Sequence, residues 1–422
     1  MTAPLRLLVV GQGYVGLPLA MRGVAAGHHV VGYDVAVERV KRLADGDSFV
    51  EDVPSDVLRD ALAGGCYSVT DGAAACEGFD VAVITVPTPL REGNPDLSAI
   101  ESAAATVAPY VRPGTLVVLE STTYPGTTEQ LFVPILEAGS GLAAGTDFHV
   151  GYSPERIDPG NLTWTLETTP KVVAGIDAAS REAVAAFYRT VVTEVVEVSS
   201  PQVAELAKLV ENTFRHVNVA LVNELAMVAA DLGIDVWEAI DAAATKPFGY
   251  LRFTPGPGVG GHCLPIDPSY LSWTVRRRLG RSFRFVELAN DVNDHMPDYV
   301  SARLVRGLNA RGLALSRATV LVLGLAYKRN SGDARESPAV ALIDRLVHGG
   351  AQVAVADPHV VEDIALDPLV RRVDPTPEEI ARADAVVLVT DHDAFDYATV
   401  AAHARYVLDT RHRLEGEHVE HL

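Results

Sequence analysis

Short apolar runs alternate with helical periodicity in the first part of the chain. Residues 5–10 (LRLLVV) and 29–34 (HVVGYD) read as buried strands, as do residues 79–89 (FDVAVITVPTP) and 115–126 (TLVVLESTTYPG). Amphipathic helical patterns separate these runs. Strands that alternate with helices predict βαβ units and a parallel sheet, which we expect to extend to about residue 197.

A long helical pattern follows at residues 199–233. Ser200 suits the N-cap of this helix, Pro201 suits its first position, and Gly233 suits its end. At about 1.5 Å per residue such a helix is roughly 45–50 Å long. This length is typical of a connector between two domains or of a dimer spine.

The last part of the chain resembles the first in outline. Residues 318–328 (ATVLVLGLAYK), 351–358 (AQVAVADP) and 383–392 (ADAVVLVTDH) repeat the order strand, turn, helix, strand and Asp, without a full glycine motif. We therefore predict an α/β fold with two Rossmann-like doubly wound domains joined by a central helical domain with a long connecting helix. The expected boundaries are 1–197, 198–310 and 311–422.

Composition and charge narrow the function. The 422 residues carry a net charge of −20, which argues against binding to nucleic acid or to anionic membranes. No apolar run reaches the roughly 20 residues of a membrane span, and the N-terminal run is too short for a signal peptide. Cys66, Cys76 and Cys263 form neither a disulfide framework nor a zinc motif. We expect a cytoplasmic protein without a metal site.

A glycine motif at the first predicted turn indicates a dinucleotide cofactor. Gly11, Gly13 and Gly16 have G-x-G-x-x-G spacing after a strand and at the start of a helix, and Asp34 ends the next strand 18 residues beyond Gly16. Such glycines allow a tight turn, close approach of a pyrophosphate and close helix packing. The acidic side chain binds ribose hydroxyls and repels a 2′-phosphate, so NAD is favoured over NADP, although Arg39 lies nearby.

Cys263 stands in an unusual loop, GPGVGGHCLPIDP, at residues 256–268. We predict a helix immediately after it, with Asp267 at the N-cap and Pro268 at the first position. A thiol just ahead of a helix N-terminus has a lowered pKa, which favours a nucleophilic thiolate. A half-buried loop cysteine is the alternative for Cys263, and a simple helix cap is the alternative for Asp267.

A nucleotide cofactor and a nucleophilic cysteine together suggest oxidation at the aldehyde level. A thiolate adds to a carbonyl, hydride leaves to the nicotinamide, and water hydrolyses the resulting thioester. Lys208 and Asn212 are four residues apart, hence on one face of the long helix, where they can stabilise an oxyanion. A surface lysine with an extended side chain explains Lys208 equally well from spacing alone.

These residues carry a resemblance that spans nearly the whole chain. The sequence resembles the family of nucleotide-sugar 6-dehydrogenases, which oxidise a sugar C6 alcohol to a carboxylate in two NAD-dependent steps without releasing the aldehyde. The matching stretches are GQGYVGLPLA, TVPTPL, ESTTYPGTT, YSPERIDPGN, AELAKLVENTFR, NELA, GPGVGGHCLPIDP and GLAYKRNSGDARESPA.

The resemblance implies a role for each matching position. Cys263 is the nucleophile, Lys208 and Asn212 stabilise the oxyanion, and Asp267 assists proton transfer through water. Glu155 is a candidate general base for thioester hydrolysis, and Thr122 positions water and nicotinamide. Further cofactor-binding candidates are Tyr14, Val15, Thr88, Thr122 and Arg39. Substrate-binding candidates are Glu155, Arg156, Lys208, Asn212, Gly260, His262, Arg252, Lys328 and Arg335.

The motifs also indicate a substrate class. YSPERIDPGN, His262 and Ile266 are similar to the branch that acts on UDP-N-acetylglucosamine, whereas GYLRFTPGPG departs from it. UDP-glucose and dTDP-glucose are alternatives. Rival functions are a two-electron β-hydroxyacid dehydrogenase and a non-catalytic nucleotide-sugar-binding protein. The resemblance further implies a homodimer or higher oligomer and a uronate product for polysaccharide or glycoside biosynthesis.

Overall fold

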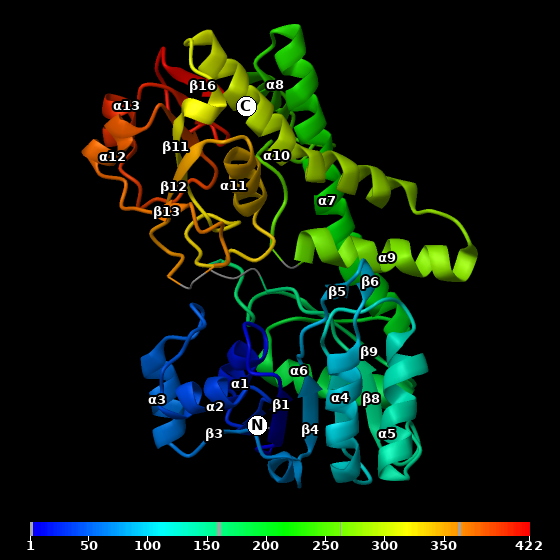
Figure 1. Ribbon diagram of the computed structural model, residues 1–422. Coiled ribbons are helices and arrows are strands. Elements are labelled where there is room, and N and C mark those ends of the chain that lie inside the picture. Colours follow the sequence, from blue (N-terminus) through cyan, green and yellow to red (C-terminus); the bar gives the residue numbers. More distant parts are fainter. Residues whose placement is uncertain (1–2, 158–160, 162, 262, 362–363) are drawn as a thin grey trace. The chain divides into compact units, whose positions relative to one another are not determined.

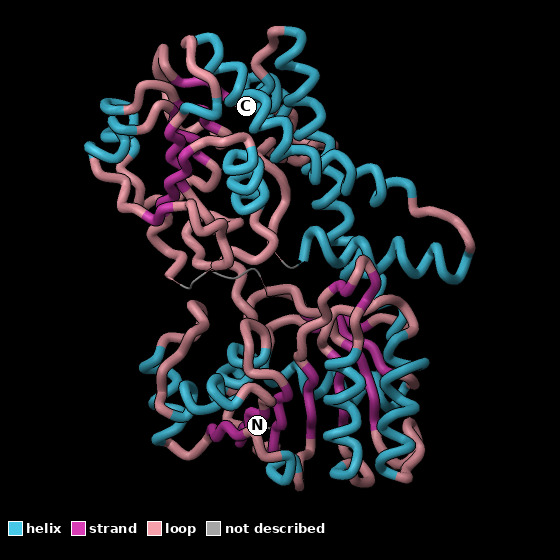
Figure 2. The backbone as a smooth tube through the Cα atoms, viewed as in Figure 1, coloured by secondary structure: helices cyan, strands magenta, loops and turns pink. Residues whose placement is uncertain are grey.

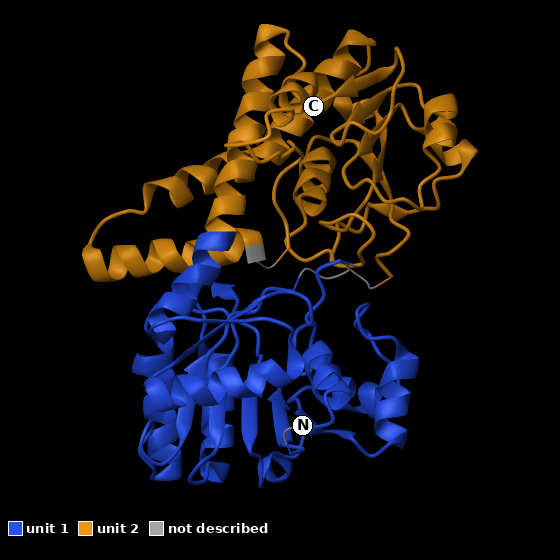
Figure 3. Ribbon diagram, turned by 180° about the vertical axis from the view of Figure 1, so that it is seen from behind, with its two compact units in different colours: residues 1–211 blue, residues 212–422 orange. Residues whose placement is uncertain are grey.

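The computed structural model describes residues 3–157, 161, 163–261, 263–361 and 364–422, without the side chain of Cys263. The chain divides into two compact units, residues 1–211 and residues 212–422 (Figure 3). Each unit contains one large, mainly parallel sheet, which confirms the predicted α/β class with two Rossmann-like domains. The predicted three-part division remains a prediction.

Unit 1 is built on an eight-stranded sheet (Figure 1). Its strands are β1 (Arg6–Val10), β2 (His29–Tyr33), β3 (Tyr67–Thr70), β4 (Val81–Ile84), β7 (Leu116–Leu119), β8 (His149–Tyr152), β9 (Lys171–Gly175) and β10 (Val195–Glu197). The order is β10-β9-β8-β7-β4-β1-β2-β3, and of the neighbouring pairs only β8 and β9 are antiparallel. From β3 to β8 this is the strand order of a dinucleotide-binding fold.

Helices separate most of these strands along the chain. They are α1 (Gly16–Ala25), α2 (Val37–Ala44), α3 (Ser55–Ala63), α4 (Ser98–Val107), α5 (Val133–Ser140) and α6 (Ala178–Val191). Shorter elements are η1 (Ala73–Cys76), η2 (Ala108–Tyr110), the π-helix η3 (Thr128–Phe132) and the hairpin of β5 (Leu90–Arg91) and β6 (Asn94–Pro95).

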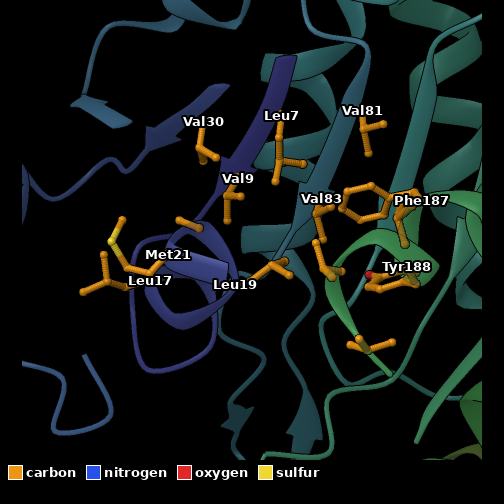
Figure 4. Packing of buried hydrophobic residues seen from close by; sticks show 14 of the residues in the cluster. Leu7, Val9, Leu17, Leu19, Met21, Val30, Val81, Val83, Phe187 and Tyr188 are labelled. Carbon is orange, nitrogen blue, oxygen red and sulfur yellow. The ribbon is translucent and has the colours of Figure 1, made fainter. Parts of the chain in front are cut away.

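The core of unit 1 follows from the alternation of strand residues. Leu7 and Val9 of β1 and Val81 and Val83 of β4 contribute to one buried cluster with residues of α1 and α6, among them Phe187 (Figure 4). Successive strand residues point to opposite faces, so alternate residues of the apolar stretches of β1 and β4 join this cluster. Strands that are apolar on both faces require helices on both sides, as in a doubly wound sheet.

A helical segment follows unit 1's sheet. Its members are α7 (Pro201–Leu232), α8 (Val236–Ala244), α9 (Cys263–Leu279) and α10 (Arg284–Ala310). The predicted long helix is confirmed as α7, and Gly233 after it has a φ of 69°, the left-handed conformation of a helix end. The division between the two units falls within α7.

Unit 2 contains a six-stranded parallel sheet (Figure 2). Its strands are β11 (Thr319–Leu323), β12 (Gln352–Ala356), β13 (Arg371–Arg372), β14 (Ala385–Leu388), β15 (Val407–Asp409) and β16 (Val419–His421). Its remaining helices are η4 (Leu315–Arg317), α11 (Pro338–His348), α12 (Pro377–Arg382) and α13 (Tyr397–His403). The order β13-β12-β11-β14-β15-β16 repeats the order of unit 1, which confirms the internal duplication.

No helix among the described residues is both long and apolar enough to cross a membrane.

Candidate active site

The turn between β1 and α1 has the geometry that a dinucleotide requires. Gly11 has a φ of 91°, which favours glycine. A Cβ on Gly16 would lie 1.8 Å from the carbonyl oxygen of Gly11, so only glycine allows this close packing. A Cβ on Gly13 would meet no atom within 4 Å, which leaves space for a pyrophosphate. The three glycines therefore fit the roles predicted for them and fit an NAD cofactor.

Asp34 lies directly after β2 beside this turn. Its Oδ2 accepts the backbone N–H of Gln12 at 2.7 Å and the Arg39 guanidinium at 2.9 Å, and its Oδ1 accepts the N–H of Ala36. The structure thus brings Asp34 and Arg39 together as an ion pair. Arg39 is 40% exposed and Asp34 is 4% exposed, so the arginine forms the outer side of the pair.

The other cofactor candidates follow strand ends of the same sheet. Tyr14 is exposed, with its ring edge-on to Phe49 at 6.2 Å between centroids, and Val15 is half-buried. Thr88 follows β4 and is buried, and Thr122 follows β7 and is half-buried. All of them stand at carboxyl ends of parallel strands or in the β1–α1 turn, where ligands of such sheets bind.

Thr85 and Glu205 fix the backbone of two loops that follow strands of this sheet. The sequence did not point to either residue. The Thr85 hydroxyl donates to the carbonyls of Val10 and Gly11 at 2.9 Å. Glu205 of α7 accepts the N–H of Gly126 at 2.5 Å, and the N–H and hydroxyl of Thr128 at 2.9 and 2.7 Å. Burial raises the pKa of Glu205, although its bonds to Thr128 oppose the shift. A glutamate on the mostly apolar α7 was the available signal.

Lys208 and Glu155 meet within unit 1. Lys208 of α7 is 7% exposed, and its ammonium donates to the backbone carbonyl of Glu155, the third residue after β8. A surface position for Lys208 is therefore wrong, because a buried lysine is held by a specific acceptor. Arg156, the next residue, forms a salt bridge with Glu211 at 2.7 Å and donates to the carbonyl of Pro170.

Asn212 and Asp267 meet within unit 2. The Asn212 amide donates to Oδ2 of Asp267 at 2.5 Å, and these residues are 5% and 3% exposed. The predicted N-cap role of Asp267 is wrong, because α9 already begins at Cys263 and contains Asp267 and Pro268. Pro265 suits the first turn of a helix, where its missing N–H costs nothing. His262 and the side chain of Cys263 lie outside the described residues.

The glycine loop before α9 packs tightly against other parts of unit 2. A Cβ on Gly260 would lie 2.7 Å from Cβ of Tyr327 and 2.8 Å from the carbonyl of Glu336. Gly261 has a φ of 80°, and its N–H donates to the carbonyl of Arg335. These glycines allow the loop that leads to Cys263 to lie directly on the loop after β11, a packing role that the sequence did not reveal.

Three predicted substrate-binding residues lie at different places in unit 2. Lys328 is half-buried in the loop after β11. Arg335 is 54% exposed and forms a salt bridge with Asp333 at 2.6 Å. Arg252 is 46% exposed and forms a salt bridge with Asp241 of α8, also at 2.6 Å.

Arg411 is a cation that the sequence analysis missed. Its Nε donates to the carbonyl of Val389 at 2.7 Å, and a Cβ on Gly256 would lie 2.7 Å from its Nη1. Burial lowers the pKa of Arg411, against the attraction of Asp391 and Asp409. No described carboxylate forms an ion pair with it. A charged residue within LDTRH, directly after β15, was the signal.

Within the described part of the chain, no group of three or more His, Cys, Asp and Glu side chains is arranged to hold a metal ion.

Comparison with known proteins gives matches along nearly the whole chain. Residues 5–192, 202–295 and 321–416 match the NAD binding, central and UDP binding domains of the UDP-glucose/GDP-mannose dehydrogenase family. These matches confirm the predicted family resemblance, the NAD cofactor and the enzyme class. They also confirm that the substrate is a nucleotide sugar.

Individual relatives are similar over about nine tenths of their length or more. The UDP-N-acetyl-D-mannosamine dehydrogenase of Pyrococcus horikoshii is 37% identical over 93% of this chain and 90% of its own. The UDP-N-acetyl-D-glucosamine 6-dehydrogenase of Pseudomonas aeruginosa is 36% identical over 93% and 91%. The solved structure of the Pyrococcus horikoshii UDP-D-ManNAc dehydrogenase aligns with a TM-score of 0.89 and 33% identity over 99% of this chain and 98% of that chain. This chain is a member of the UDP-glucose/GDP-mannose dehydrogenase family.

Proposed function

We propose that this enzyme oxidises the C6 alcohol of a UDP-linked N-acetylhexosamine to the uronate, in two NAD-dependent steps through a thioester on Cys263. The observation that carries the proposal is the buried Asn212–Asp267 hydrogen bond, which joins α7 to the first turns of the helix that begins at Cys263. The names of the two similar relatives support an N-acetylated sugar. UDP-glucose and dTDP-glucose remain the alternative substrates.

The N-terminal sheet supplies the cofactor site in this proposal. Gly11, Gly13 and Gly16 hold the pyrophosphate of NAD, Asp34 binds the adenosine ribose with Arg39 beside it, and Tyr14, Val15, Thr88 and Thr122 line the rest of the site. NAD, when bound, would supply the hydride acceptor, and the four-electron oxidation consumes two NAD⁺ in succession, one for each hydride. Asp34 favours a free 2′-hydroxyl because its charge repels a 2′-phosphate.

The chain's own residues supply the covalent and proton-transfer chemistry. The Cys263 thiolate adds to the C6 aldehyde, and the Lys208 ammonium and Asn212 amide stabilise the negative charge on oxygen. Asp267 assists proton transfer through water, and Thr122 positions the water. Glu155 accepts the proton of the water that hydrolyses the thioester. A covalent intermediate prevents loss of the aldehyde between the two hydride transfers.

We assign the nucleotide of the substrate to residues of unit 2. The family resemblance suggests Lys328 and Arg335 for this role. Arg411 is a third candidate, because its guanidinium is packed within unit 2 and forms no ion pair with a carboxylate among the described residues. Arg156, Arg252, Gly260 and His262 remain candidates for the sugar and phosphates. We propose a division into an NAD-binding domain at 1–197, a central domain at 198–310 and a nucleotide-sugar domain at 311–422.

We further propose a cytoplasmic homodimer with α7 as its spine. Exposed apolar side chains follow this helix at intervals of three or four residues, with one interval of seven: Val203, Leu206, Val210, Phe214, Leu221, Leu225, Val228 and Leu232. Such a stripe is typical of a helix that packs against another helix. Leu225→Glu should halve the mass measured by light scattering, whereas Leu369→Glu, at an exposed residue outside α7, should not.

Counting NADH against a panel of nucleotide sugars tests the function. We expect two NADH per molecule of UDP-N-acetylglucosamine or UDP-N-acetylmannosamine consumed, and slower turnover of UDP-glucose, dTDP-glucose and GDP-mannose. A ratio near one favours a two-electron β-hydroxyacid dehydrogenase. No turnover with any sugar, together with retained binding, favours a nucleotide-sugar-binding protein.

The thioester step has its own test. Cys263→Ser should reduce uronate formation by at least about 1,000-fold, because it removes the nucleophile. Cys66→Ser is the matched control at a half-buried free thiol and should leave the rate unchanged. Full turnover of Cys263→Ser contradicts the covalent mechanism.

A further inference from the structure

A buried cluster of charged side chains lies beside Glu155 in unit 1. Glu120 follows β7, Lys171 is the first residue of β9, and Tyr188 belongs to α6. The side chains of Glu120 and Lys171 are 0% and 3% exposed. The Lys171 ammonium contacts Oε1 of Glu120, and the Tyr188 hydroxyl donates to Oε2 at 2.9 Å. This ion pair has no role in the reaction proposed above.

Glu155 faces the same ammonium. Nζ of Lys171 lies 3.9 Å from Oε2 of Glu155. This oxygen is buried and has no hydrogen-bond partner among the described residues. The other oxygen of Glu155 accepts the N–H of Ile157, and its backbone carbonyl accepts the Lys208 ammonium from α7. The backbone and one oxygen are therefore fixed, while Oε2 has an unused lone pair next to the cation.

Two carboxylates of this cluster face one ammonium group. Glu120 and Glu155 both lie against Lys171, and the Lys208 ammonium, which binds the backbone carbonyl of Glu155, is a second cation beside them. Burial raises the pKa of Glu120, since the loss of hydration outweighs the attraction of Lys171, and the charge of Glu155 raises it further. Burial and the neighbouring Glu120 also raise the pKa of Tyr188, which stays neutral. A change at Glu120 or Lys171 must therefore alter the electrostatic environment of Glu155.

We propose that the Glu120–Lys171 pair positions Glu155: the Lys171 ammonium holds Oε2 of Glu155 in place, and Glu120 limits how much of the lysine charge Glu155 receives. The inference rests on the role proposed for Glu155 in hydrolysis. In that step the water proton moves to Glu155 and the water oxygen bonds to the thioester carbon. The C–S bond then breaks, and sulfur leaves as the Cys263 thiolate.

Two substitutions with opposite expected effects test this inference. Lys171→Met removes the cation, so the acidic limb of the pH profile of kcat should move up by about one pH unit, a tenfold loss of rate on that limb. Glu120→Gln leaves the whole lysine charge to Glu155, so the limb should move down. Hydrolysis follows both hydride transfers, so the burst of NADH before steady state should keep its amplitude in both variants.

The control removes a comparable ion pair elsewhere. Arg303→Met breaks the salt bridge to Glu420 in unit 2, which measures 2.6 Å, and should leave the acidic limb in place. A limb that stays in place in Lys171→Met and Glu120→Gln overturns the inference and leaves a purely structural pair. If Lys171→Met does not fold, the nearly isosteric Glu120→Gln decides alone.

Glu155→Gln separates this inference from the proposed function. If Glu155→Gln turns over at the wild-type rate, the role of Glu155 in hydrolysis is wrong. If Glu155→Gln is slow while Lys171→Met and Glu120→Gln keep the wild-type pH profile, only the positioning inference is wrong. In the Glu155→Gln background, Lys171→Met should cause no further change in the profile.

Discussion

The two Rossmann-like sheets share the order of six strands, and each has a glycine after its first strand and an aspartate after its second, yet the full G-x-G-x-x-G motif of a dinucleotide site follows only β1. Gly11 after β1 and Gly324 after β11 have φ angles of 91° and 96°. Both donate their N–H to the last residue of the next strand. Asp34 and Asp357 each follow that strand and accept an N–H from the residue after the glycine.

The difference begins two residues after each of these glycines. Gly13 faces open space, whereas Ala326 occupies the corresponding place in unit 2 and donates its N–H to Asp357 at 2.9 Å. Helix α1 begins at Gly16, but α11 begins only at Pro338. In the described part of unit 2, no helix therefore begins close behind the glycine turn to stabilise a pyrophosphate.

The two aspartates differ in how many donors they satisfy. Oδ2 of Asp357 accepts Leu325, Ala326 and His392, and Oδ1 accepts the N–H of His359 and Val360. Nδ1 of His392 accepts a hydrogen bond from the backbone N–H of Asn330. The ring therefore carries its proton on Nε2, which donates a hydrogen bond to Asp357. All the lone pairs of Asp357 are used within the protein. The aspartate at this position of the fold is the proposed ribose-binding residue in unit 1, whereas in unit 2 its carboxylate binds only groups of the protein among the described residues.

The largest expected effect comes from the glycine turn of unit 1. Gly16→Val should raise the KM for NAD by at least about 100-fold, or roughly 3 kcal/mol, because its side chain collides with the Gly11 carbonyl and displaces α1. Gly13→Ala has space for its methyl group and should fold normally, with a smaller increase of about tenfold from hindered pyrophosphate approach. Steady-state kinetics measures both, and a wild-type KM for NAD in Gly16→Val contradicts the assignment.

The next largest effect distinguishes the two aspartates. Asp357→Asn should lower the free energy of unfolding by about 2–3 kcal/mol, because two or more of its buried donors lose a charged acceptor. Asp34→Asn should instead raise the KM for NAD, with about 1 kcal/mol of destabilisation. Urea unfolding, monitored by hydrogen exchange of the backbone amides of β11 and β12, measures the loss of stability in unit 2. Equal destabilisation by Asp34→Asn and Asp357→Asn contradicts the distinction between a ligand-binding aspartate in unit 1 and a structural aspartate in unit 2.

Acid should reveal the same property of Asp357. Burial alone raises its pKa, but the hydrogen bond from His392 and those from Ala326, His359 and Leu325 outweigh it and hold the pKa well below its ordinary value. A lowered native pKa contributes stability above the unfolded value of about 3.9, and this contribution is lost as the pH falls below it. The stability difference between wild type and Asp357→Asn should therefore shrink below about pH 4.

A smaller effect tests what unit 2 binds instead of a dinucleotide. Arg411→Met should raise the KM for the sugar nucleotide by about 10- to 30-fold, the loss of one or two hydrogen bonds to a charged group. The KM for NAD should not change. Arg405→Met, at a guanidinium 63% exposed and paired with Asp384, is the matched control. If both arginine variants behave alike, Arg411 has only a packing role.

The fold and the cofactor turn were predictable because their signals are local. Glycine spacing, apolar runs and the caps around α7 each lie within one short stretch of sequence. The start of α9 was not predictable in this way. Asp267 lies within a helix that begins four residues earlier, and its side chain accepts a hydrogen bond from Asn212 instead of capping the helix. Propensity favoured a cap at this aspartate, and a tertiary hydrogen bond prevailed.

The buried ion pairs could not be derived from sequence for a related reason. Glu120 and Lys171 are 51 positions apart and meet only because β7, β8 and β9 are neighbours in the sheet. Each ends or begins an apolar strand, LVVLE and KVVAG, so a charge at the boundary of a buried run was the available signal. Arg411 after β15 has the same signature. Such a charge indicates a partner without saying which residue provides it.

The smallest expected effect concerns a substitution that restores a glycine to unit 2. Ala326→Gly recreates the residue type of Gly13, and it should give no measurable NAD binding to unit 2 and less than about a threefold change in the KM for the sugar nucleotide, or under 0.7 kcal/mol. The reason is that a glycine alone supplies neither a free carboxylate nor a helix N-terminus. Isothermal titration with NAD measures the number of binding sites. The double variant Gly13→Ala/Ala326→Gly, in which the site of unit 1 is weakened, distinguishes NAD binding at the turn of unit 2 from binding at the turn of unit 1. A second equivalent of bound NAD contradicts the view that Asp357 and the long β11–α11 connection, rather than the methyl group of Ala326, exclude the dinucleotide.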